Sequence, residues 1–166
     1  MKKIFSFFVV ALMSITLVAG PNDLLWDYST GAPSSNPDNG LTYGSVIKDG
    51  PGVKNGLYGI KLNSTGYAAF TKAAVAGTLK LGFGPRSGTS ATSVAVYTWA
   101  GDTPAAETLI ATTAELTEYG YVQVDLPAEY TNIYLKRGGS VETALQVIQF
   151  TEFVPRAFVD FKLEFR

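Results

Sequence analysis

The chain has 166 residues, a length typical of one domain, with 13 basic residues, 14 acidic residues and a formal net charge of −1. It contains neither cysteine nor histidine, which excludes disulfides, thiolate nucleophiles, zinc–thiolate sites, histidine-ligated metals and a Ser-His-Asp triad. No run of basic residues could neutralise a row of phosphates, so we expect no nucleic-acid partner.

The first twenty residues have the pattern of a secretory signal peptide. A basic start, MKK, precedes an apolar run over Ile4–Val18 and the small residues Ala19 and Gly20. The run is shorter than the roughly 20 residues of a spanning helix, so we expect cleavage and no transmembrane helix in the mature chain. The sequence does not decide whether the cleavage follows Ala19 or Gly20. It predicts a domain over residues 21–166 that is secreted, periplasmic or at the cell surface, and not a lipoprotein, because cysteine is absent.

Beyond that segment, apolar and polar residues alternate in short runs that are separated by Gly, Pro, Asn and Asp. In chain order these runs predict strands at Leu24–Tyr28, Leu41–Ile47, Leu57–Leu62, Tyr67–Thr71, Leu79–Phe83, Val94–Trp99, Thr108–Thr112, Val122–Leu126, Ile133–Lys136, Ala144–Phe150 and Ala157–Arg166. Residues 29–56 are dense in turn formers, and the alanine-rich segment Thr71–Thr78 is predicted to be a turn because strands flank it.

The segment Tyr130–Phe150 is predicted to be a β-hairpin. Two apolar runs flank a Gly pair, which permits the positive φ that hairpin turns favour, and the turn is expected near Arg137–Val141. Period two directs Ile133 and Leu135 to the core, and Tyr134 and Lys136 to the solvent.

Alternation of this kind predicts an all-β chain with antiparallel sheets that each have one solvated side. With no helix to cover the apolar faces, two sheets must cover each other, so we expect one antiparallel β-sandwich of jelly-roll type, with Trp26 in its core. A small outer-membrane barrel is the alternative, although most runs are shorter than the roughly 9–11 residues of a spanning strand.

The order of several short motifs carries a resemblance. The motifs are "LLWDYSTG", "NGLTYG", "GLYGIKLNSTGYAAF", "AGTLKLGFG", "VAVYTW", "YVQVDLPA", "YTNIYLKRGG" and "TALQVIQF". Together they resemble the galactose-binding-like jelly-roll modules of secreted, polysaccharide-degrading Gram-negative bacteria, some of which are attached to pectate lyases. The resemblance covers residues 24–150 and implies a non-catalytic, carbohydrate-binding module. Binding residues vary among such modules, so it assigns none here.

The candidate binding residues are Tyr97, Trp99 and Tyr134, which period two places opposite the core. Exposed aromatic rings stack on the apolar faces of sugars, while polar side chains reach the hydroxyl groups. Lys136, Arg137 and Gln123 are expected to supply those polar partners, and Arg86 in the loop Gly82–Gly88 is expected to bind an acidic sugar. If the face is covered, the same three aromatic residues belong to the core instead.

Catalysis is not expected, because the sequence shows no recognisable pair of carboxylates of the kind that glycosidases use. The carboxylates that could form a pair are Asp102, Glu107, Glu115, Glu118 and Asp125. No cofactor is expected, although a structural calcium ion on loop carboxylates and carbonyls stays open.

A polysaccharide or oligosaccharide is the expected partner. The rival interpretation is a structural or assembly protein of the cell surface, in which the C-terminal strand Ala157–Arg166 pairs with another chain.

Overall fold

The computed structural model describes residues 20–33, 38–47 and 56–153. These ranges hold β1 (Leu24–Asp27), β2 (Thr42–Tyr43), β3 (Val46–Ile47), β4 (Gly59–Leu62), β5 (Ala68–Thr71), β6 (Gly77–Pro85), β7 (Val94–Thr98), β8 (Thr108–Thr112), β9 (Gly120–Leu126), β10 (Asn132–Arg137) and β11 (Thr143–Glu152). In the same ranges no helix is long and apolar enough to cross a membrane. The predicted signal peptide, except for its last residue, and the predicted C-terminal strand lie outside the described residues.

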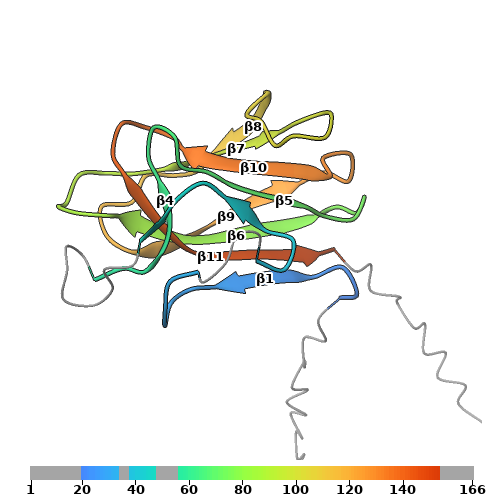
Figure 1. Cartoon of the computed structure of the whole chain (residues 1–166). Coiled ribbons are helices and arrows are strands. Elements are labelled where there is room, and N and C mark those ends of the chain that lie inside the picture. The colour runs from blue at the N-terminus through green and yellow to red at the C-terminus, as the bar shows by residue number, and fades with distance from the viewer. Residues whose placement is uncertain (1–19, 34–37, 48–55, 154–166) are drawn as a thin grey trace, which may run out of the picture.

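The strands form two antiparallel sheets that lie one above the other (Figure 1). One sheet has the order β3-β4-β11-β6-β9, and β1 pairs with the second half of β11 on the side where β4 pairs with the first half. The other sheet has the order β2-β5-β10-β7-β8. Most connections cross from one sheet to the other, so that β4-β11-β6-β9 faces β5-β10-β7-β8. This is the strand order of a jelly roll, and the predicted fold is confirmed.

The core lies between the two sheets and is filled by the inward side chains of both. The largest fully buried side chains are Phe70, Phe83, Phe150, Leu41, Ile60, Leu62, Leu79, Leu81, Leu126, Ile133, Leu135 and Leu145. Trp26 is also buried, as predicted, and its ring lies 5.1 Å from that of Phe70. Its indole Nε1 donates to the carbonyl oxygen of Asp38 at 3.0 Å, so the polar edge of the ring is satisfied where β1 meets the following turn.

The predicted hairpin at Tyr130–Phe150 is wrong, because its two strands belong to different sheets. β10 lies between β5 and β7, whereas β11 lies between β4 and β6. The segment between β10 and β11 therefore crosses the edge of the sandwich instead of forming a tight turn within one sheet. The predicted burial of Ile133 and Leu135 is confirmed, since a crossover and a hairpin can give a strand the same buried face.

Two other predictions of local structure need correction. The run Leu41–Ile47 is divided into β2, which pairs with β5, and β3, which pairs with β4 in the opposite sheet. The segment Gly82–Gly88 is not a loop throughout, because β6 continues to Pro85. Its glycines make room for a neighbour: a Cβ at Gly84 would lie 2.9 Å from the backbone of Tyr119.

Candidate functional site

The outer face of the six-stranded sheet carries a row of polar side chains across three adjacent strands. Gln149 on β11 is the register partner of Lys80 on β6, and Lys80 is the partner of Gln123 on β9. Each of the three is partly or fully exposed, while its neighbours along the strand point into the core. A second row lies two residues before Lys80 on β6, where Thr151 is opposite Thr78.

A β-bulge is what turns Gln149 outward. The pairing of β11 with β6 shifts between Leu145 and Val147, which inserts one residue into β11. Leu145 and Ile148 both lie in the core, three residues apart, so the inward phase changes along the strand. Without the bulge, period two from Leu145 would direct Gln149 toward the core.

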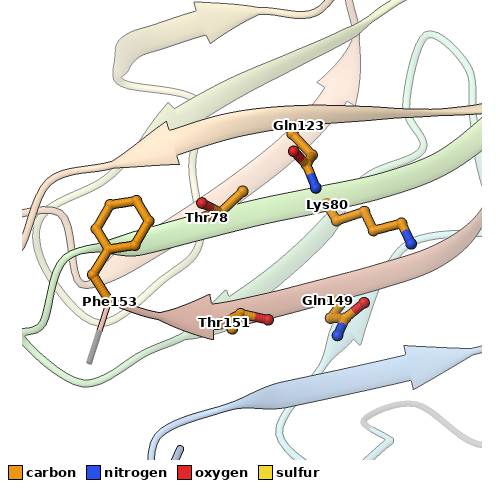
Figure 2. A pocket seen from close by; sticks show the side chains of 6 residues that line it. All are labelled: Thr78, Lys80, Gln123, Gln149, Thr151 and Phe153. Carbon is orange, nitrogen blue, oxygen red and sulfur yellow. The ribbon is translucent and has the colours of Figure 1, made fainter. Parts of the chain in front are cut away.

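These side chains enclose a hollow of about 330 Å³ on the sheet surface (Figure 2). Its lining residues are Thr78, Lys80, Gln123, Gln149, Thr151 and Phe153. Two amides, two hydroxyls and one ammonium provide both donors and acceptors at its floor. Figure 2 shows the Phe153 ring at one end of the hollow. The Lys80 side chain extends along β6 in the direction away from Phe153.

Large apolar side chains border the same face. Among the described residues the exposed large hydrophobic side chains are four, and three of them lie on this face: Leu25, which is 62% exposed, Tyr121, which is 54% exposed, and Phe153, which is 55% exposed. Leu25 on β1 is the register partner of Gln149, and Tyr121 on β9 is the partner of Gly82. The backbone N–H of Phe153 donates to the carbonyl oxygen of Ala76, whereas Tyr121 is opposite Gly82. Ala76 and Gly82 are about six residues apart, so the backbone positions that carry the two aromatic rings are separated by about 20 Å along the strand direction.

The position of Tyr121 depends on Gly82 and Tyr119. The rings of Tyr119 and Tyr121 meet edge to face, with centroids 5.5 Å apart. A Cβ at Gly82 would lie 2.5 Å from the Tyr119 hydroxyl oxygen and 2.8 Å from the Tyr121 ring, so the glycine provides the space that both tyrosines use. Burial raises the pKa of the Tyr119 hydroxyl well above its ordinary value.

The predicted residues Tyr97, Tyr134 and Lys136 lie on the outer face of the other sheet. Tyr134 on β10 is the register partner of Tyr97 on β7, and its ring stacks on that of Tyr67 with centroids 5.1 Å apart and an interplanar angle of 11°. Burial, followed by the effect of Tyr67, raises the pKa of Tyr134. The side chains of Tyr67, Tyr97, Tyr134 and Lys136 are all half-buried, so each exposes only part of its surface to a ligand.

Of the remaining predicted residues, Trp99 is buried, Arg137 has a local hydrogen bond and Gln123 lies in the other sheet. Trp99 is 9% exposed and offers little ring surface to a ligand. Arg137 donates from Nη1 to the carbonyl oxygen of Ser140 at 2.6 Å. Gln123 was expected beside the tyrosines, but β9 belongs to the opposite sheet, so that expectation is wrong.

Arg86 belongs to a separate group of charges at the end of β6. Its Nη1 lies 2.7 Å from a carboxylate oxygen of Glu142, and Lys61 Nζ lies 3.3 Å from the other oxygen. The hydrogen bond from Arg86 is the main reason that the pKa of Glu142 lies below its ordinary value. The group joins β4 and the end of β6 to the start of β11.

Within the described residues, no three acidic side chains cluster closely enough to hold a metal ion. Glu107 accepts a hydrogen bond from the backbone N–H of Ala100, and Asp125 accepts one from the Thr78 hydroxyl. These contacts explain two of the five candidate carboxylates as local structure.

The fold and the outer-face hollow define a two-sheet jelly-roll module with a solvent-facing polar site. No protein-family model matches the chain, and no curated protein matches it either. Among solved structures it is similar to one from the Ruminococcus flavefaciens cellulosome, described in connection with an expansion in glycan recognition. That similarity has a TM-score of 0.48 and 19% identity and covers 81% of this chain and 98% of the other.

Two further similarities involve parts of larger enzymes. One is to the CBM22-1–GH10 modules of a Clostridium thermocellum xylanase in complex with xylohexaose, with a TM-score of 0.48, 12% identity and 80% of this chain covered. The other is to the catalytic domain of a GH87 α-1,3-glucanase in complex with tetrasaccharides, with a TM-score of 0.47, 15% identity and 86% of this chain covered. The chain spans 30% of the length of each of these two proteins.

Proposed function

We propose that this protein is an exported, non-catalytic carbohydrate-binding module, and that the hollow over β11, β6 and β9 is its binding site. The observation that carries the proposal is the composition of the hollow, where amides and hydroxyls form the floor and apolar side chains border it. A sugar ring needs both kinds of surface. Its hydroxyl groups exchange hydrogen bonds with amides and hydroxyls, while its C–H face covers an aromatic ring.

The length and openness of the site fit a chain of linked sugars better than a single compact ligand. Phe153 and Tyr121 stand about 20 Å apart along the strand direction, and the polar rows lie between them. An open sheet face covers only one side of a ligand, so we expect weak binding with Kd values in the range of about 1 μM to 1 mM.

Calorimetry on the hits of a glycan array tests the proposal. The double variant Gln123→Ala/Gln149→Ala removes both amides of the central row and is expected to weaken binding by about tenfold, since each lost hydrogen bond contributes about 0.5–1.5 kcal/mol. Both residues are at the surface, so the variant should unfold at the same temperature as the wild type.

The tyrosine face is the second candidate site, because Tyr97 and Tyr134 are adjacent and partly exposed there. The double variant Tyr97→Ala/Tyr134→Ala serves as the matched control on the opposite sheet. If this variant loses binding while the glutamine variant keeps it, the site belongs to the tyrosine face and our assignment of the hollow is wrong.

Two other outcomes would overturn the function itself. Release of reducing ends or unsaturated products from a panel of polysaccharides would make the chain an enzyme. No binding to any glycan, together with concentration-dependent association in light scattering, would favour the assembly protein instead.

A further inference from the structure

Among the described residues that line the hollow, one side chain is charged, and that charge is positive. Of its six lining residues only Lys80 is ionisable, and it lies at the centre of the row between the amides of Gln123 and Gln149. No described carboxylate forms an ion pair with it, whereas Lys61 and Arg86 in the same sheet both pair with Glu142. Lys80 is thus a cation whose five fellow lining residues are uncharged.

The ammonium group of Lys80 is positioned by an aromatic ring. Its Nζ lies 4.4 Å from the centroid of Tyr121, which is the distance of a cation–π contact. This contact holds the long side chain along the sheet surface and does not neutralise its charge. A bound anion would meet an ammonium whose direction is already restricted, so less side-chain entropy is lost on binding.

Three carboxylates on the same sheet accept hydrogen bonds from donors other than Lys80. Asp125 accepts a hydrogen bond from the Thr78 hydroxyl at 3.1 Å. Asp27 accepts one from the backbone N–H of Ser29 at 2.8 Å, and Glu152 accepts one from the Asn22 side chain at 2.5 Å. Local donors hold these three groups, and none of them lines the hollow.

We propose that the hollow selects an acidic polysaccharide and that Lys80 binds the anionic group of one sugar, either the carboxylate of a uronate or a sulfate ester. The inference rests on the proposed function and names the class of glycan for the same site. Gln123 and Gln149 are the register partners of Lys80 on the two adjacent strands, so their amides can bind the hydroxyl groups of the same or the next sugar.

Calorimetric titrations with three oligosaccharides of equal length test this: an oligogalacturonate, a sulfated galactan and a neutral xylan fragment. We expect one of the two acidic ligands to bind more tightly than the neutral one. Raising the salt from about 0.1 M to about 1 M shortens the screening length from about 10 Å to about 3 Å and should weaken acidic binding. Whichever acidic ligand binds more tightly identifies the anionic group.

Three variants isolate the charge of Lys80. Lys80→Gln should weaken binding of the acidic ligand about three- to tenfold and leave the neutral ligand unchanged, while Lys80→Arg should retain most of the acidic affinity. Lys136→Gln removes an equal charge from the outer face of the opposite sheet and should change neither. Thermal unfolding of each variant verifies that the fold is intact.

The outcomes separate this inference from the proposed function. If neutral glycans bind best and Lys80→Gln has no effect, the choice of an acidic ligand is wrong and the binding function stands. If Lys136→Gln weakens acidic binding while Lys80→Gln does not, the anion binds at the tyrosine face and the inference is overturned. If none of the three ligands binds, and the glycan array gives no hit, both proposals fail.

Discussion

Replacing Phe153 by alanine is the sharpest test of the apolar side of the proposed site. Phe153 is 55% exposed and lines the hollow at the end of β11, next to Thr151. A phenylalanine side chain has about 200 Å² of surface, so about 110 Å² of this ring is open to solvent. A sugar that stacks on one side of the ring covers about half of that area, or about 55 Å².

At about 25 cal/mol per Å², removing this contact costs about 1.4 kcal/mol, which is a tenfold rise in Kd. Because the ring is largely exposed in the free protein, Phe153→Ala should lower the free energy of unfolding by less than about 0.5 kcal/mol. Phe153→Tyr keeps the ring and should keep the affinity, which makes it the matched control.

Calorimetry gives the Kd of each variant, and urea unfolding gives its stability. An unchanged Kd for Phe153→Ala would refute the reasoning, since the ring would then contribute no contact to the bound ligand. A large loss of stability in the same variant would show that the ring supports the fold, and the area argument would no longer apply.

Two further predictions concern the fold. Gly59 has φ of +122°, and a Cβ there would lie 2.3 Å from the carbonyl oxygen of Leu145, so Gly59→Ala should lower the free energy of unfolding in urea by more than about 2 kcal/mol. Gly31→Ala, where a Cβ meets no atom within 4 Å, should change it by less than about 0.5 kcal/mol, and equal effects would contradict the argument. The hydrogen bond from Arg86 is the main cause of the lowered pKa of Glu142. The ionised Glu142 therefore contributes to the free energy of unfolding above its ordinary pKa of 4.5, and this contribution is lost as the pH falls through the folded-state pKa. The Glu142 side chain is 40% exposed, so the contribution should be below about 1 kcal/mol; Glu142→Gln should lessen the acid-induced loss of stability, and an identical pH profile would contradict this.

Period two in the sequence determined which side of most strands faces the core. Leu79 and Leu81 are buried and Lys80 between them is not, as the alternation predicts. The same holds for Ile133 and Leu135 on β10. Together with the absence of any amphipathic helix, this pattern sufficed to predict a two-sheet antiparallel sandwich, because apolar strand faces without helices must cover one another.

The sequence could not determine which strands are neighbours. A strand that ends a hairpin and a strand that crosses to the opposite sheet have the same alternation, so β10 and β11 were expected to pair although they lie in different sheets. Strand pairing depends on contacts between distant segments, which one run of residues does not encode. For the same reason Gln123 was grouped with Tyr97 and Tyr134, although it lies on the far side of the molecule beside Lys80.

Only the tertiary structure brought the hollow together. Lys80 and Gln123 could be recognised in the sequence as outward residues of separate strands, but nothing there indicated that Gln149 joins them. Its outward position results from the bulge in β11, which changes the phase between Leu145 and Ile148. Because a shift of one residue exchanges the two faces of a strand, the long-range pairing of β11 with β6, and not the local pattern, decided which side chains form the candidate site.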